Sequence, residues 1–384
     1  MALSKIDVAN MLTGATPISN GGTGLTSNVS RPNAKSLIIN GNMDVWQRTT
    51  SATATTGAYV TVDMYKISED TDGSYTTERH TMSNAEKQTT GFDYALKAVC
   101  TGTDSSIGAS QTAEITQKIE AQNCQVLQYG TSNAKSLTLA FWVKSSKTGT
   151  YCIAIRKRDS TSYDIPIEYT ISSADTWEKK VIHISPTAGS TSFITSSGGA
   201  ITNDTGEGIF VLFALAIGSN FHGTNNTWVA ATKVATSNQV NWMDSTDNDF
   251  YLTGVQLEVG EFDSTTIPPF QFESFDDNLK RCQRYFQAFH PRGSGKAFGS
   301  TTAYLQVPLL TTMRATPSYS QNAVFRITNN DTGEFTQSSA GGGFDQGDAN
   351  SGRLSGNNFS SLTDAQTIHA APNGNVSAHF SSEL

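Results

Sequence analysis

Hydrophobic and polar residues alternate over short stretches along most of this chain. Leu137, Leu139, Phe141 and Val143 form one face of a predicted strand, and Trp142 points to the opposite face. The same pattern predicts further strands over residues 151–157, 165–171, 177–184, 209–217 and 250–259. Because Gly- and Ser-rich turns separate these strands without intervening helices, the pattern predicts an all-β fold built on an antiparallel sandwich.

Three segments of the predicted sandwich carry further signals. Residues 36–46 predict an opening strand with an Asn-Gly turn signal. Residues 111–119 fit either a short helix or a strand, since they also alternate with a period of two. In the last strand, Val255, Leu257 and Val259 share one face, which predicts that they point into the core.

A helical spacing replaces the alternation after the sandwich. Ser274 is a typical N-cap, and Asp276 and Asp277 favour the positive end of a helix dipole. Pro291 ends the pattern. Apolar residues recur on one face at spacings of three and four, namely Leu279, Cys282, Phe286 and Phe289. The sequence predicts a helix over 274–289 and leaves open whether it is a hinge or a trimer interface.

The chain divides into four parts. Residues 1–33 are rich in turn formers and too poor in apolar residues to bury a core, so they are either a flexible leader or a docking segment that orders on a partner. Residues 34–273 form the predicted sandwich, and 274–290 the linking helix. Residues 291–384 restart with strands and include a polar, Gly-rich stretch, which predicts a smaller β-rich tip domain. Because its core is small, this domain would bury much of its apolar surface against neighbouring copies of the chain.

The charge and hydropathy of the chain limit its partners. Charged residues make up 16% of the 384 residues, and the formal net charge is −8. No basic surface is therefore expected to hold nucleic acid. The longest apolar run, Ile209–Ile217, is too short to span a membrane, so we expect no membrane insertion. The four cysteines are widely separated, as in a protein made in a reducing cytosol.

The sequence contains no recognisable catalytic or metal-binding motif. The glycines of 21–27 lack the lysine of a phosphate-binding loop, and the acidic stretch 244–249 misses the EF-hand pattern. Glycoside cleavage needs two suitably spaced carboxylates, and no pair stands out among the 34 Asp and Glu residues. We therefore expect no catalytic residues, no cofactor and no metal ligands, with a glycoside hydrolase as the alternative.

Three tryptophans are candidates for sugar binding. Non-catalytic sites stack flat aromatic rings on pyranose rings and surround them with amide and carboxylate groups. Trp142 faces away from the apolar side of its strand, and Trp228 and Trp242 lie beside loops rich in asparagine. The alternative for each ring is a packing role in the core.

Several segments of the chain, which we call the signature segments, resemble bacteriophage tail fibre proteins. They are GGTG (21–24), INGNMDVWQR (39–48), VQLEVG (255–260), PFQFE (269–273), CQRYF (282–286) and MRATP (313–317). One departure is Asp63-Met-Tyr65, where the family commonly has Asp-Arg-Trp. The resemblance implies a jelly-roll domain similar to carbohydrate-binding modules.

The resemblance also implies a function and partners. It points to a homotrimeric fibre of the virion, made in the host cytoplasm, that binds host surface polysaccharide or lipopolysaccharide. A purely structural tail protein is a further possibility. Residues Pro17, Gly21, Gly22 and Gly24 would attach the fibre to other tail proteins. A structural calcium would lie near 42–44 and 253–254, although the usual acidic residue is missing from the last strand.

Overall fold

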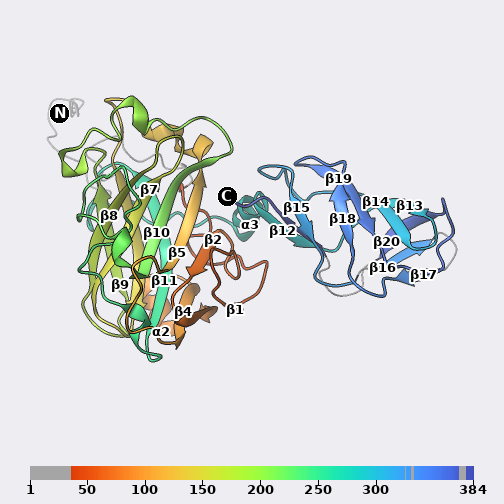
Figure 1. The fold of residues 1–384 in the computed structure, drawn as a ribbon, viewed down its shortest axis with the longest axis horizontal. Coiled ribbons are helices and arrows are strands. Elements are labelled where there is room, and N and C mark those ends of the chain that lie inside the picture. The colour runs from red at the N-terminus through yellow and green to blue at the C-terminus, as the bar shows by residue number, and fades with distance from the viewer. Residues whose placement is uncertain (1–35, 325, 330–332, 372–377) are drawn as a thin grey trace, which may run out of the picture.

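The computed structural model describes residues 36–384 apart from 325, 330–332 and 372–377. Antiparallel strands dominate this part of the chain, and they form two bodies side by side along the long axis (Figure 1). The larger body is a two-sheet sandwich of the jelly-roll type, and the smaller, which we call the tip domain, contains strands β12 to β21. The predicted all-β fold is confirmed. The predicted attachment residues Pro17, Gly21, Gly22 and Gly24 lie outside the described residues.

The sandwich consists of a six-stranded and a five-stranded sheet. The first has the order β1-β3-β4-β11-β6-β9, with bounds Ser51–Thr53, Ser74–Thr81, Tyr94–Gly102, Asp249–Val259, Leu137–Ser145 and Glu178–Ile184. The second has the order β2-β5-β10-β7-β8, with bounds Tyr65–Glu69, Thr112–Glu120, Glu207–Ile217, Gly149–Lys157 and Tyr163–Ile171. The ambiguous stretch 111–119 is therefore a strand.

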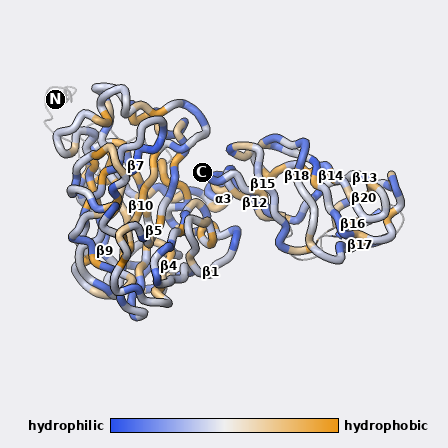
Figure 2. Tube along the Cα trace, in the orientation of Figure 1, coloured by the Kyte–Doolittle hydropathy of each residue, from blue (hydrophilic) through white to orange (hydrophobic). Residues whose placement is uncertain are grey.

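The core of the sandwich lies between its two sheets. Leu139, Phe141 and Val143 on β6 are fully buried there, and so are Val255 and Leu257 on β11. The inward faces predicted from the alternation are thus confirmed. Figure 2 shows the same arrangement as hydrophobic stretches along β5 and β10 inside the body. Burial of this apolar surface stabilises the domain by roughly 25 cal/mol per Å².

The opening segment differs from the prediction. Residues 36–46 form bends and a turn, not a strand. The Asn40 side chain accepts hydrogen bonds from the backbone N–H groups of Asp44 and Val45, both at 3.0 Å, and donates to the Val45 carbonyl. Because one amide satisfies these backbone groups locally, the segment needs no neighbouring strand to pair with.

In the part of the chain that the structure describes, two α-helices flank the six-stranded sheet and the junction. Helix α2 (Asn84–Thr90) starts at a capping box, in which Ser83 and Glu86 exchange hydrogen bonds. Helix α3 (Phe275–Gln283) begins at the predicted N-cap Ser274. No helix in the described part of the chain is long and apolar enough to cross a membrane.

Helix α3 ends earlier than predicted. Residues Phe286–Phe289 form strand β12, which pairs with β21 (Ala378–Ser381), so the helical prediction beyond Gln283 is wrong. The side chains of Cys282 and Tyr285 are buried in the core of the sandwich. The helix is therefore an integral part of the sandwich and not a free hinge.

The tip domain contains a seven-stranded and a three-stranded sheet. The larger has the order β17-β16-β20-β13-β14-β19-β18, with bounds Glu334–Thr336, Arg326–Asn329, Thr367–Ala371, Ser294–Phe298, Thr302–Pro308, Ser351–Gly356 and Gly342–Asp345. The smaller joins β12 and β21 to β15 (Ser318–Ser320). A small core containing Leu305, Leu354 and Ile368 lies behind the larger sheet.

The C-terminal residues return to the junction between the two bodies (Figure 1). Arg48 of the sandwich pairs with Asp63 at 3.1 Å and with Glu383 at 2.6 Å. Arg314 of the tip domain donates to the backbone carbonyls of Ser382 and Glu383. The junction is thus built from buried, charged hydrogen bonds between distant parts of the chain.

Candidate functional site

Two of the three candidate tryptophans lie in the interior. Trp228 and Trp242 are 0% exposed. The indole N–H of Trp228 donates to the Ser185 carbonyl at 2.9 Å, and that of Trp242 to the Asp249 carbonyl at 3.1 Å. Neither ring has a free face for a sugar, so these two site predictions are wrong. The rings pack and satisfy their only donor within the core.

Trp142 lies on the outer face of the six-stranded sheet, as its position in β6 predicted. It is half-buried, and its neighbour across the strand pair is Thr253. The next residue, Gly254, has a φ of +61° at an irregularity in the β6–β11 pairing. A Cβ at Gly254 would lie 2.5 Å from the Phe92 ring and 3.0 Å from Trp142. This glycine therefore lets two aromatic rings approach the sheet from above.

Phe92 belongs to a larger group of rings. Its centroid lies 4.9 Å from that of Phe270 and 5.3 Å from that of Phe272, and the latter two are 4.9 Å apart. Phe272 is 62% exposed, and Phe270 is half-buried. We call Phe92, Trp142, Phe270 and Phe272 the aromatic patch. A large aromatic ring held at the surface beside other rings is typical of a binding surface.

Two polar residues lie further along the outer face of β11. Gln256 and Glu258 follow Gly254 on the outer face, opposite Ala140 and Thr138 of β6. Burial raises the pKa of Glu258 above its ordinary value. Among the described residues Glu258 has no side-chain partner, so its carboxylate is available to accept hydrogen bonds from a ligand.

A second polar group lies beside Phe92. Burial, with a smaller contribution from the charge of Asp93, raises the pKa of Asp44 to about 6. The Asp44 carboxylate accepts a hydrogen bond from the Asn42 amide, and Asp93 pairs with Lys87 at 2.6 Å. Two neighbouring carboxylates next to aromatic rings supply the acceptors that sugar hydroxyls require.

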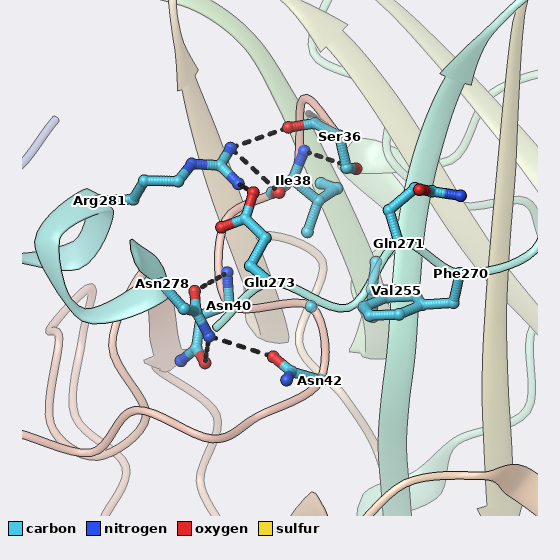
Figure 3. A pocket seen from close by; sticks show the side chains of 11 residues that line it. Ser36, Ile38, Asn40, Asn42, Val255, Phe270, Gln271, Glu273, Asn278 and Arg281 are labelled. Carbon is cyan, nitrogen blue, oxygen red and sulfur yellow. Dashed lines mark hydrogen bonds and ion pairs between the residues drawn. The ribbon is translucent and has the colours of Figure 1, made fainter. Parts of the chain in front are cut away.

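A small pocket adjoins the patch (Figure 3). It is lined by Ser36, Ile38, Asn40, Gly41, Asn42, Val255, Phe270, Gln271, Glu273, Asn278 and Arg281. Arg281 and Glu273 point toward each other across it, with Nη1 and Oε1 2.6 Å apart. Arg281 also donates to the Ser36 carbonyl at 2.8 Å. On the opposite wall lie Phe270 and Gln271.

The base of this pocket is a group of three asparagines (Figure 3). The Asn278 amide donates to Asn42 at 3.2 Å and to Asn40 at 3.3 Å, and its oxygen accepts from the backbone N–H of Asn40. A Cβ on Gly41 would lie 2.0 Å from the Val255 carbonyl, so only glycine fits there. Three of the signature segments, 39–48, 255–260 and 269–273, therefore meet at this pocket beside α3.

The position where the resemblance would place calcium has few free side-chain oxygens among the described residues. Among the described residues no three His, Cys, Asp or Glu side chains converge. The Thr253 hydroxyl donates to the Tyr94 carbonyl at 2.7 Å, and Asn42 donates to Asp44. Calcium prefers six to eight oxygen ligands, and Asp44 alone does not supply such a cage.

Helix α2 is fixed to the outer face by one carboxylate. Glu86 accepts hydrogen bonds from Lys144 at 2.8 Å, Trp177 at 3.0 Å and His80 at 3.1 Å. Burial alone would raise the pKa of Glu86, but these bonds and those from Ser83 hold it far below its ordinary value. Glu86 is ionised and its oxygens are occupied by these partners, so it anchors α2 to the outer face and is not free to bind a ligand.

Comparisons with known proteins concern the fold. No protein-family model matches the sequence, and no curated protein matches it. The structure is similar to a candidate sugar-binding protein from Bacteroides thetaiotaomicron, with 15% identity, a TM-score of 0.32, and coverage of 59% of this chain and 100% of that one. It is also similar to a family 11 carbohydrate-binding module from Clostridium thermocellum, with 11% identity, a TM-score of 0.26, and coverage of 55% and 96%.

A third similarity is to the enzymatically active domain of tailspike protein 4 of bacteriophage CBA120. The identity is 13%, the TM-score is 0.26, and the match covers 58% of this chain and 21% of that one. This chain therefore spans about a fifth of the tailspike chain. At these identities the likeness concerns the fold alone.

Sequence reasoning missed most of the patch. Phe270 and Phe272 were recognised only as part of PFQFE, and Phe92 not at all. A usable signal was present, because Phe270 and Phe272 are two aromatic residues of a segment without an apolar strand pattern. Such residues have no core to enter and so remain at the surface.

Proposed function

We propose that this protein is a bacteriophage tail fibre that binds a glycan on the host-cell surface and works as a homotrimer in the virion. The observation that supports glycan binding best is the aromatic patch, with carboxylates and amides at its edge. The signature segments support the virion role. In this proposal the N-terminal segment attaches to other tail proteins.

The patch suits weak, stacking-based recognition. A pyranose ring would lie on Phe272 and Phe270, and its hydroxyls would donate to Glu258 or to the Asp44–Asp93 pair. A single shallow site of this kind binds weakly. Three copies in a fibre, and several fibres on a particle, multiply such binding into avidity.

The test is binding of the full chain to an array of bacterial surface polysaccharides and lipopolysaccharides. F272A and W142A should each weaken binding about tenfold, which is the loss typical of a central aromatic contact. F275A is the matched control, because Phe275 is 56% exposed and lies outside the patch. Equal binding by F272A, W142A and the wild type would exclude the patch. Binding to virions without binding to any glycan or cell would favour a purely structural tail protein.

The proposed homotrimer can be tested by the mass of the protein in solution. Sedimentation velocity of the full chain should give three times the monomer mass. A monomer at micromolar concentration would contradict the homotrimer and remove the avidity argument with it.

A second candidate function is cleavage of the bound glycan. It is favoured by one observation, namely that the pKa of Asp44 is raised to about 6 beside Asp93. A carboxylic acid whose pKa is raised toward neutrality is the kind of group that glycoside hydrolysis uses as its acid. Release of reducing ends from a bound polysaccharide, abolished in D44N and retained in E78Q, would establish it. Intact polysaccharide after long incubation would leave the protein as a non-catalytic binder.

A further inference from the structure

The outward face of the seven-stranded sheet in the tip domain is unusual for a surface. Buried Ala297, Leu305 and Leu354 point to the core behind the sheet. The residues that alternate with them therefore face outward. Phe298 is among these, and it is 59% exposed at the end of β13. A strand does not need a large exposed ring for its own stability.

Phe298 is the outer member of an ordered array. Its centroid lies 5.3 Å from that of Tyr304 on β14, with an angle of 34° between the ring planes. The guanidinium carbon of Arg353 on β19 lies 4.4 Å from the Tyr304 centroid. Phe298, Tyr304 and Arg353 thus form a continuous array across three adjacent strands. We call these three residues the tip platform.

One member of the platform is held by an ion pair. Arg353 makes two hydrogen bonds to the Asp345 carboxylate, at 2.7 and 2.8 Å, and this pair fixes the guanidinium beside Tyr304. A ring held in place by such contacts loses little side-chain entropy on binding. The arrangement therefore favours recognition over a role in packing.

Free polar groups flank the rings. Lys296 lies directly opposite Tyr304 in the β13–β14 pairing, and Gln306 lies opposite Arg353 in the β14–β19 pairing. Both side chains are exposed, and within the described part of the chain neither has a side-chain partner. An ammonium group and an amide beside a flat ring match the hydroxyl and carboxylate oxygens of a sugar.

We propose that the tip platform is a second glycan-binding site, in which a sugar ring stacks on Phe298 while Lys296 and Gln306 bind its oxygens. The inference rests on the proposed function only for its class of ligand, since its residues are separate from the aromatic patch. Two sites on one chain would allow a single polysaccharide to be held at both the sandwich and the tip.

The experiment uses the full chain and the same array of bacterial polysaccharides and lipopolysaccharides. F298A should weaken binding about tenfold, whereas F298W should restore it because an aromatic face is kept. L310A is the matched control, since Leu310 is a 53% exposed residue of the same domain outside the platform. Circular dichroism melting and sedimentation velocity of each variant report on folding and on self-association.

The outcomes separate the two sites. A loss in F298A that F298W restores, with L310A unchanged and the mass unaltered, supports the platform. Unchanged binding by F298A together with a loss in F272A overturns the platform and leaves the proposed function intact. An altered mass in F298A without a change in glycan binding assigns the face to a second copy of the chain and overturns the platform. A wild-type chain that binds no glycan overturns both proposals.

Discussion

Arg48 lies over the ring of Phe286, with its guanidinium carbon 3.6 Å from the ring centroid. The arginine belongs to the sandwich, and the phenylalanine begins β12 of the tip domain. Because the same guanidinium binds Asp63 and Glu383, one side chain links three distant parts of the chain through both charge and stacking. The junction between the two bodies depends on it.

Replacement of Arg48 should therefore destabilise the protein strongly. At pH 8, where Asp63 is mostly ionised, R48M keeps apolar bulk but leaves Asp63 and Glu383 buried without the Arg48 cation, which costs about 3–5 kcal/mol. Urea denaturation measures this loss. K147M is the control, since Lys147 pairs with Asp244 near the surface and its removal should cost less than about 1 kcal/mol. Similar losses of unfolding free energy in R48M and K147M would show that the ion pairs of the junction stabilise the protein no more than a surface pair does.

The junction should also make stability depend on pH. Burial raises the pKa of Asp63 to about 7, against the opposing effect of Arg48, and burial raises that of Glu383. A carboxylate whose pKa is higher in the folded chain binds protons more readily there, so its contribution to stability grows as the pH falls from 8 toward 4. Urea denaturation at pH 8 and pH 5.5 should show greater stability at the lower pH. D63N should reduce this difference, and an identical slope in D63N would contradict the assignment.

Gly254 should tolerate no side chain. G254A forces a positive φ on alanine, which costs about 1–2 kcal/mol, and brings its Cβ against Phe92. G91A is a matched control, because Gly91 has a φ of +84° but nothing within 4 Å of the added carbon. We expect G254A to lower the free energy of unfolding clearly more than G91A. G254A should also weaken glycan binding, because it displaces the rings of the patch.

Glu86 should stabilise the sandwich only above acidic pH. Its pKa is lowered in the folded chain, so its contribution is present above the ordinary value of 4.5 and is lost as the pH falls below it. E86Q should cost at least about 1 kcal/mol at pH 7 through weaker bonds to Lys144 and His80. Hydrogen exchange of α2 should rise in E86Q. E78Q is the control, since Glu78 pairs with Lys97 at the surface. If the difference in unfolding free energy between E86Q and wild type stayed constant down to pH 3, the mechanism would be disproved.

The sequence predicted the strands and their faces well where alternation is strong. Leu139 and Phe141 point inward and Trp142 outward because a strand allows only two directions. It failed where hydrogen bonds made by single side chains replace regular pairing, as in the turn around Asn40. It also extended α3 too far, because Phe286 fits a helical spacing and a strand equally well. The capping box of Ser83 and Glu86 was readable, and it would have predicted α2.

The candidate site was harder to predict, because exposure depends on contacts distant in sequence. Trp228 and Trp242 lie in polar loops, yet those loops fold over the sheets and bury both rings. Phe92, Phe270 and Phe272 come together only because residues 268–273 cross the outer face, where the Gln256 amide binds the Pro268 carbonyl. No local pattern encodes such a crossing.

The pairing of Arg48 with Glu383 also has a consequence for the order of folding. The two residues are separated by 335 positions in the chain, and Asn40 and Asn278 by 238. During synthesis the sandwich can form its sheets early. The opening turn cannot make its hydrogen bonds between Asn40 and Asn278 until α3 has left the ribosome. Arg48 can pair with Asp63 early, but its second carboxylate, Glu383, becomes available only when the C-terminal residues have been made. Contacts between residues so distant in sequence slow folding. In a refolding experiment the sandwich should therefore form first, and the contacts of the junction should form in a later, slower phase.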